Sequence, residues 1–185
     1  MIEKEIKAII SKDEYERIKH LFHWDKQINQ VNYYYGNSIE STSMEITIRV
    51  RKIENNIYLQ VKIPIEYNKA LHIKKEFEEK IDFVPNYITK EQLYNLTGQV
   101  DYDVKLIGKL STERYIHSQN NIEICLDKNN YFNKEDYEIE IEYKDEYPQN
   151  CIDILKKNNI DFNIHTDGKC IRFMKEYESM KGREK

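Results

Sequence analysis

Residues Asp136–Tyr143 read DYEIEIEY, so that Glu138, Glu140 and Glu142 alternate with large apolar residues. Because successive side chains of a β-strand point to opposite faces, this octet predicts a strand with one apolar face and one carboxylate face. The same period of two recurs along the chain. The other segments that show it are Ile2–Ile10, Met44–Ile53, Asn56–Ile65, His72–Phe83, Asp103–Leu110, Glu113–His117 and Asn121–Leu126. About eight strands are enough to close an antiparallel sheet into a barrel.

Helical signals are fewer and occur at the edges of these segments. Ser11 is a suitable N-cap for the run DEYERIKHLF, and Thr89 is one for KEQLYNL, which ends at Gly98. Pro148 opens the run QNCIDILKKNN, and a last helix is expected after Gly168. We therefore expect an α+β fold that is mainly antiparallel β: a closed eight-stranded barrel with a few flanking helices.

The chain has only five Gly and three Pro and shows no internal repeat, so its turns depend mostly on Asn, Asp and Ser. We predict turns at Glu54–Asn56, Asn120–Asn121 and Asn129–Asn130. A single domain over residues 1–185 is expected, with a flexible tail from about residue 180.

The composition excludes several classes of protein. Lys and Arg number 29 against 33 Asp and Glu, with no basic block, which argues against a dedicated nucleic-acid binder. No apolar stretch is long enough for a secretion signal or a membrane span, so a cytoplasmic protein is expected. The three cysteines are odd in number and lack CxxC spacing, and Cys125 is expected in the core. The five histidines show no metal-ligand spacing.

The predicted strands carry charge on one face each. Examples are Arg49 with Arg51, and Glu3 with Glu5. One such face is usually solvated, but in a closed barrel these faces can line the lumen instead. Clustered carboxylates would then require Mg²⁺ or Mn²⁺ between them, and the Arg and Lys side chains would require an anion such as phosphate. A polyphosphate with a bound divalent metal satisfies both requirements.

The stretch Glu3–Lys7 resembles the ExExK opening of the CYTH domain, whose superfamily is also called the triphosphate tunnel metalloenzymes. Later segments resemble the family's strands in the same order along the chain. They are Gln30–Gly36, Thr47–Arg51, Tyr58–Pro64, Lys74–Ile81, Leu110–Tyr115, Cys125–Tyr143 and Gly168–Met174. The pattern looks closest to the bacterial adenylate-cyclase-like (thiamine triphosphatase-like) branch.

This resemblance implies a barrel whose tunnel binds a triphosphate, with carboxylates on metal and basic residues on phosphate. The implied catalytic carboxylates are Glu3, Glu5, Glu138 and Glu140. The implied metal ligands are the same four residues together with Glu76 and Asp127. The implied substrate-binding residues are Lys7, Arg49, Arg51, Lys62, Arg114, Lys169 and Arg172. Glu78 is the alternative to Glu76, Glu142 is a further candidate, and the C-terminal basic residue could be Lys169 or Arg172.

One departure from the family concerns the strand around Arg114. Many members have KxR there, whereas this chain has Thr112. Lys109 lies outside that register and is expected to be a surface charge.

The expected reaction is hydrolysis of a linear triphosphate, with inorganic triphosphate favoured over thiamine or nucleoside triphosphates. The alternatives are a class IV type adenylate cyclase, which makes cyclic AMP and pyrophosphate, and a non-catalytic polyphosphate- or nucleotide-binding module. Trp24 and Tyr33–Tyr35 could stack on an organic group, but packing is the favoured role. No nucleic-acid or membrane partner is expected.

Overall fold

The computed structural model describes residues 1–36, 46–68, 70–162, 164 and 166–183. Within them the strands are β1 Ile2–Ile10, β2 Lys26–Gly36, β3 Thr47–Ile53, β4 Asn56–Asn68, β5 Leu71–Ile81, β6 Tyr87–Ile88, β7 Val104–Gln119, β8 Ile122–Tyr131 and β9 Lys134–Tyr143. The helices are α1 Lys12–Lys19, α3 Lys90–Thr97, α4 Gln149–Lys157 and α5 Lys169–Arg183.

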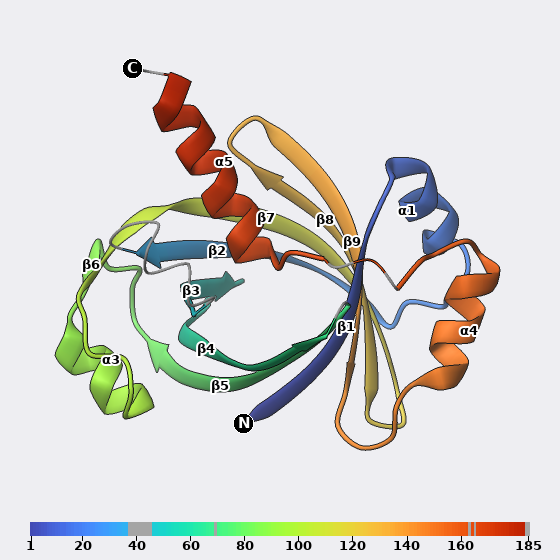
Figure 1. Ribbon diagram of the computed structural model, residues 1–185, viewed down its shortest axis with the longest axis horizontal. Helices are drawn as coiled ribbons and strands as arrows, with labels where there is room; N and C mark the ends of the chain where they lie inside the picture. Colours follow the sequence, from blue (N-terminus) through green and yellow to red (C-terminus); the bar gives the residue numbers. More distant parts are fainter. Residues whose placement is uncertain (37–45, 69, 163, 165, 184–185) are drawn as a thin grey trace.

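Eight strands form a closed antiparallel barrel, which confirms the predicted fold. Their order is β2-β3-β4-β5-β1-β9-β8-β7, and the pairing of β2 with β7 closes the ring. The short strand β6 pairs with the first two residues of β7, Val104 and Lys105. In Figure 1, α1 and α4 lie on one side of the barrel, α3 lies on the opposite side, and α5 lies over β2 and β7. Strands β3 and β9 are four places apart in a ring of eight and so lie opposite each other.

The helix ends are set by local side chains, as the sequence predicts. Ser11 and Glu14 form a capping box at the start of α1, and Thr89 and Gln92 form another at the start of α3. Gly98 ends α3 with φ 69°, a left-handed conformation that glycine adopts without steric cost. Within the part of the chain that the structure describes, no helix is long and apolar enough to span a bilayer.

Two of the three clusters of apolar side chains lie outside the barrel wall, beneath helices. One cluster packs under α1 and α4 and includes Ile139 and Leu155. A second packs under α3. The third, with Tyr34 and Phe173, packs between α5 and interior-facing side chains of the barrel. The other face of the wall carries buried charge instead. The buried charged residues are Glu3, Glu5, Lys7, Arg49, Lys62, Lys74, Arg114, Asp127, Glu138, Glu140 and Lys169. The prediction that the charged strand faces line the lumen is therefore confirmed.

Several predicted elements differ from the structure. Strand β7 is one strand of 16 residues where two were predicted. Alternation in the sequence did not predict β2, because polar residues lie on both of its faces. The turn predicted at Asn129–Asn130 is wrong: both residues lie in β8, and the chain turns after it, where Phe132 has φ 51°. Residues 180–183 belong to α5; residues 184–185, and the first two residues of the strand predicted over Met44–Ile53, lie outside the described residues.

Candidate active site

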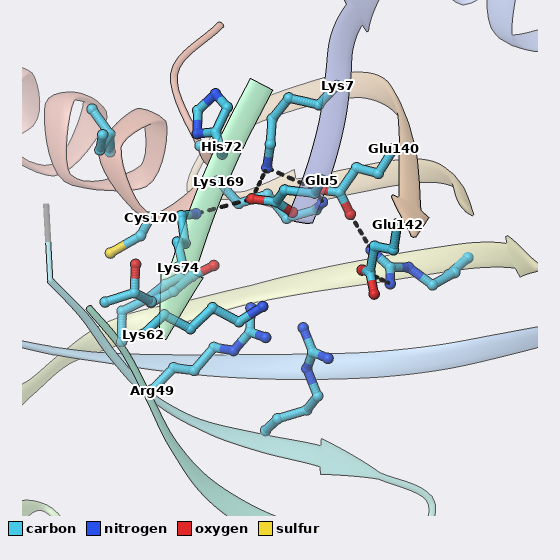
Figure 2. A pocket seen from close by; sticks show the side chains of 16 residues that line it. Glu5, Lys7, Arg49, Lys62, His72, Lys74, Glu140, Glu142, Lys169 and Cys170 are labelled. Atoms are coloured by element: carbon cyan, nitrogen blue, oxygen red, sulfur yellow. Dashed lines mark hydrogen bonds and ion pairs between the residues drawn. The ribbon is translucent and has the colours of Figure 1, made fainter. Parts of the chain in front are cut away.

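A cavity inside the barrel is lined by side chains from seven of its strands, six of which contribute charged residues, and by the start of α5 (Figure 2). The lining residues are Glu5, Lys7, Tyr34, Thr47, Arg49, Arg51, Lys62, His72, Lys74, Arg114, Glu140, Glu142 and residues 168–171. The strand residues among them project from alternate positions, since a period of two places every second side chain on the interior face. The alternating charged residues, a pattern also typical of a solvated strand face, thus line one cavity.

A first carboxylate group consists of Glu3, Glu5 and Glu142, each of which offers an oxygen within 4.8 Å of the others. They meet because β1 pairs with β9 in a register that sets Glu5 opposite Glu142. Burial and the neighbouring Glu3 carboxylate raise the pKa of Glu142 to about 7. Burial also raises the pKa of Glu3, although Lys62 opposes this effect. Among the described residues, the buried Oε1 atom of Glu3 has no hydrogen-bond partner.

A second carboxylate group, Asp127, Glu138 and Glu140, has the same spacing but is neutralised by the protein itself. Arg114 donates two hydrogen bonds to Asp127, at 2.8 Å and 2.7 Å. Lys169 Nζ lies 2.8 Å from Asp127 Oδ2 and 3.1 Å from Glu140 Oε1, and it also contacts Glu138. The two groups therefore differ in their counter-ions, because Arg114 and Lys169 contact the second group whereas lysines of the barrel wall contact the first.

The interior lysines pair with carboxylates. Lys7 Nζ lies 2.9 Å from both Glu5 Oε1 and Glu140 Oε1, and Lys74 Nζ lies 3.0 Å from Glu5 Oε1. Although burial raises the pKa of Glu5, the two ammonium groups outweigh it and hold that pKa well below its usual value. Lys62 contacts Glu3 and lies 3.6 Å from Glu76 Oε1.

Arg49 and Arg51 are held by neutral partners instead. Arg49 Nε donates to Gln60 Oε1 at 2.8 Å, and Arg51 Nε donates to Asn32 Oδ1 at 3.0 Å. Throughout the described residues, no carboxylate oxygen lies within 4.0 Å of either guanidinium. Burial and the nearby Arg49 and Arg114 lower the pKa of Arg51 to about 10. This side of the cavity therefore carries positive charge that the protein does not balance locally.

Most of the expected substrate-binding residues meet in this cavity. Lys7, Arg49, Arg51, Lys62, Arg114 and Lys169 all line it. Arg172 does not: it pairs with Asp136 at 2.9 Å and with Glu138 at 2.7 Å. Of the expected carboxylates, Glu76 lies in neither group; its partner is Lys62. The alternative Glu78 accepts a hydrogen bond from Gln60 at 2.5 Å.

The departure from the family at position 112 leaves a neutral pair. The Thr112 hydroxyl donates to Asn129 Oδ1 at 2.7 Å, and both residues are buried. Lys109 is exposed. Cys125 is buried, but it lies opposite Glu140 in the register of β8 and β9 and so faces the interior rather than the apolar core.

Sequence reasoning missed the lining residues His72 and Lys74, and it considered Tyr34 only as a stacking aromatic for which packing was favoured. The first two precede Glu76 on the same strand face, so extending that period of two would have found them. Burial, and next Lys7, lower the pKa of His72 to about 3, so its imidazole is neutral. Tyr34 carries no charge and follows no charged pattern, and nothing in the sequence separates it from Tyr33 and Tyr35.

A closed antiparallel barrel in which buried carboxylates face buried arginines is a tunnel for a highly charged anion. The chain belongs to the CYTH family, since the CYTH domain profile matches residues 1–158. Helix α5 lies beyond the matched residues.

Known relatives agree with this assignment. "Putative triphosphatase YjbK" of Bacillus subtilis (strain 168) is 30% identical over 152 residues, which are 78% of each chain. A Bacillus halodurans structure described as a putative adenylate cyclase has a TM-score of 0.68 at 24% identity, over 91% of this chain and 95% of the other. HpAC1 from Hippeastrum, described as a putative adenylyl cyclase with a dominant triphosphatase activity, has a TM-score of 0.72 at 17% identity, over 94% and 96% of the two chains.

Proposed function

We propose that this protein hydrolyses a linear triphosphate inside its barrel with the help of Mg²⁺ or Mn²⁺, and that inorganic triphosphate is its substrate. The observation that carries the proposal is the charge arrangement of the cavity. Among the described residues Arg49 and Arg51 on β3 have no carboxylate partner, while the opposite side of the ring carries three carboxylates close enough together to bind one divalent cation. A metal-bound triphosphate supplies an anion for the two arginines and a divalent cation for the three carboxylates. The names of the relatives from Bacillus subtilis and Hippeastrum support the same activity.

Glu3, Glu5 and Glu142 fit a divalent cation better than the second carboxylate group does. The raised pKa of the Glu142 carboxyl indicates that negative charge in the first group is not fully compensated. Three carboxylates within 4.8 Å provide the oxygen ligands that Mg²⁺ and Mn²⁺ prefer. When bound, such an ion neutralises phosphoryl oxygens and lowers the pKa of a bound water. The second group already contacts Lys169 and Arg114.

The residues of this chain supply position and charge for phosphoryl transfer. Arg49 and Arg51 would bind non-bridging oxygens and stabilise the charge that spreads over the equatorial oxygens in a loose transition state. Lys7 bridges Glu5 and Glu140 and thereby fixes the two carboxylates relative to each other. Water is the nucleophile in this proposal, so no serine or cysteine nucleophile is needed.

Inorganic triphosphate is favoured because most of the candidate stacking aromatics pack elsewhere. Trp24 packs against Phe22 and Tyr115, and Tyr33 and Tyr35 belong to the apolar cluster under α3. A substrate without an organic group needs no such contact. The proposal includes a cytoplasmic location and a small-molecule substrate rather than a nucleic acid or a membrane.

The test is a substrate panel of inorganic triphosphate, thiamine triphosphate and ATP with Mg²⁺ and Mn²⁺ in turn. Orthophosphate, pyrophosphate and cyclic AMP are measured in every reaction. We expect orthophosphate and pyrophosphate from inorganic triphosphate and no cyclic AMP from ATP. Cyclic AMP with stoichiometric pyrophosphate would establish a cyclase instead, and saturable binding without any product would establish a binding module.

A further inference from the structure

The interior face of β2 carries three neutral polar residues at alternate positions, Gln30, Asn32 and Tyr34. Their exposed fractions are 2%, 0% and 0%. Among the described residues, the Gln30 amide atoms, Asn32 Nδ2 and Tyr34 Oη have no hydrogen-bond partner. Buried polar groups in folded proteins are nearly always paired, because a buried group without a partner has lost its hydrogen bonds to water and gained none in their place. A row of such groups beside a cavity indicates that a ligand completes their hydrogen bonds.

Tyr34 lies beside a second donor without a partner. In the register of β2 and β3 it is opposite Arg49, whose Nε donates to Gln60 but whose buried Nη2 has no hydrogen-bond partner within the described part of the chain. Both residues line the same cavity. A phenol hydroxyl and a guanidinium N–H on adjacent strands suit an anion with several acceptor oxygens.

The position of the Tyr34 hydroxyl is fixed by the helix above it. The Tyr34 ring packs against Phe173 of α5 with 4.9 Å between ring centroids, in a cluster that also contains Leu110 and Cys170. The first turn of α5 lines the cavity next to Tyr34, and the N-terminal end of a helix favours an anion. Burial raises the pKa of Tyr34 to about 12, so the hydroxyl keeps its proton at neutral pH.

We propose that Tyr34 Oη and Arg49 Nη2 form a phosphate subsite at the α5 end of the cavity, where the phenol donates a hydrogen bond to a non-bridging oxygen of the triphosphate. This inference rests on the proposed function for the identity of the ligand. It adds a neutral hydroxyl donor to the charged residues proposed to bind phosphate, and it assigns one end of the substrate to the side of the cavity next to α5.

The experiment compares Tyr34→Phe with Tyr35→Phe, two adjacent tyrosines on opposite faces of β2. The Tyr35 hydroxyl donates to the Pro85 carbonyl at 2.6 Å outside the barrel. Affinity for inorganic triphosphate is measured by calorimetry in EDTA, so that neither metal nor turnover enters, and the melting temperature of the unliganded protein is measured in parallel. Because Tyr34→Phe removes only a hydroxyl that has no partner among the residues the structure describes, we expect it to fold as the wild type does and to bind about 10-fold more weakly, which corresponds to one hydrogen bond. Tyr35→Phe should show the reverse: a lower melting temperature and unchanged affinity.

Equal affinity of Tyr34→Phe and wild type would overturn the subsite, as would an equal loss of affinity in both variants or no measurable binding by the wild type. The result is separate from the proposed function. If Tyr34→Phe weakens binding but the wild type shows no turnover in the substrate panel, the subsite stands and the hydrolase does not. If turnover is found and the affinity of Tyr34→Phe is unchanged, the hydrolase stands and the subsite does not.

Discussion

Lys169 Nζ lies 2.8 Å from Asp127 Oδ2, so that the first residue of α5 is joined to the interior face of β8. The same ammonium group contacts Glu138 and Glu140. Helix α5 begins after the residues that match the CYTH profile, yet it supplies the cation that neutralises the second carboxylate group. A lysine therefore takes the place that a metal ion could otherwise occupy there.

Replacing Lys169 should convert the second carboxylate group into a metal site. In metal-free buffer, Lys169→Met should lower the free energy of unfolding by about 3–5 kcal/mol, since removing one partner leaves buried charge uncompensated. Mn²⁺ should recover more stability in this variant than in the wild type. Urea denaturation with and without Mn²⁺ measures both effects. Lys175→Met, on the same helix at a side chain 68% exposed, is the matched control and should behave as the wild type. An equal response of Lys169→Met and wild type to Mn²⁺ would show that this group does not accept metal.

In the first carboxylate group, by contrast, removing one charge should raise the free energy of unfolding. Burial and Glu3 raise the pKa of Glu142 from 4.5 to about 7, so the folded protein loses stability as pH rises from 4.5 to 7 and the loss is complete above pH 7. At pH 8 without metal, Glu142→Gln should therefore raise the free energy of unfolding by on the order of 1–3 kcal/mol. The same variant should bind Mn²⁺ more weakly. Denaturation and metal titration test the two parts, with Glu79→Gln, exposed on the same barrel, as the control.

Glu5 is predicted to be essential for turnover and dispensable for the fold. It belongs to the first carboxylate group and forms ion pairs with Lys7 and Lys74. Glu5→Gln keeps the shape of the side chain but removes its charge, so hydrolysis of inorganic triphosphate should fall by roughly 100-fold or more at saturating metal. Circular dichroism should show the barrel unchanged. Wild-type turnover with both substrate and metal saturating would contradict the site assignment.

The barrel could be predicted from the sequence because its strands bury charge on one face and apolar residues on the other. That alternation is strong in β1, β3 and β9, where Glu or Arg recurs at every second position. It fails in β2, whose interior residues Gln30 and Asn32 are neutral and therefore do not stand out. The family resemblance placed β2 where the pattern alone did not.

The pairing of charges could not be predicted in the same way. The sequence shows that Glu138, Glu140 and Glu142 share one face, but the neighbours of each depend on strand order and register. Register sets Glu142 beside Glu5 and Glu138 beside Asp127, and so divides one run of carboxylates between two groups with different charge balance. The role of Lys169 depends further on where α5 docks, which local sequence does not determine.

His72 provides the clearest prediction of pH dependence. It is 1% exposed, and burial together with Lys7 lowers its pKa from 6.5 to about 3. Between these two pH values the unfolded chain binds a proton at this position and the folded protein does not. The contribution of His72 to the free energy of unfolding is therefore fully present above pH 6.5 and is lost as pH falls towards 3. In His72→Gln this contribution is absent. The difference in free energy of unfolding between wild type and variant should therefore shrink by about 1.4 kcal/mol per pH unit below pH 6 and stay constant above pH 7.

Urea denaturation at pH 8, 7, 5.5 and 4.5 measures this difference, and the imidazole proton signals of His72 should not shift between pH 8 and pH 5. Parallel stability curves for the two proteins, or an imidazole that titrates near pH 6.5, would show that His72 becomes protonated in the folded barrel and that the cavity is open to water at that point.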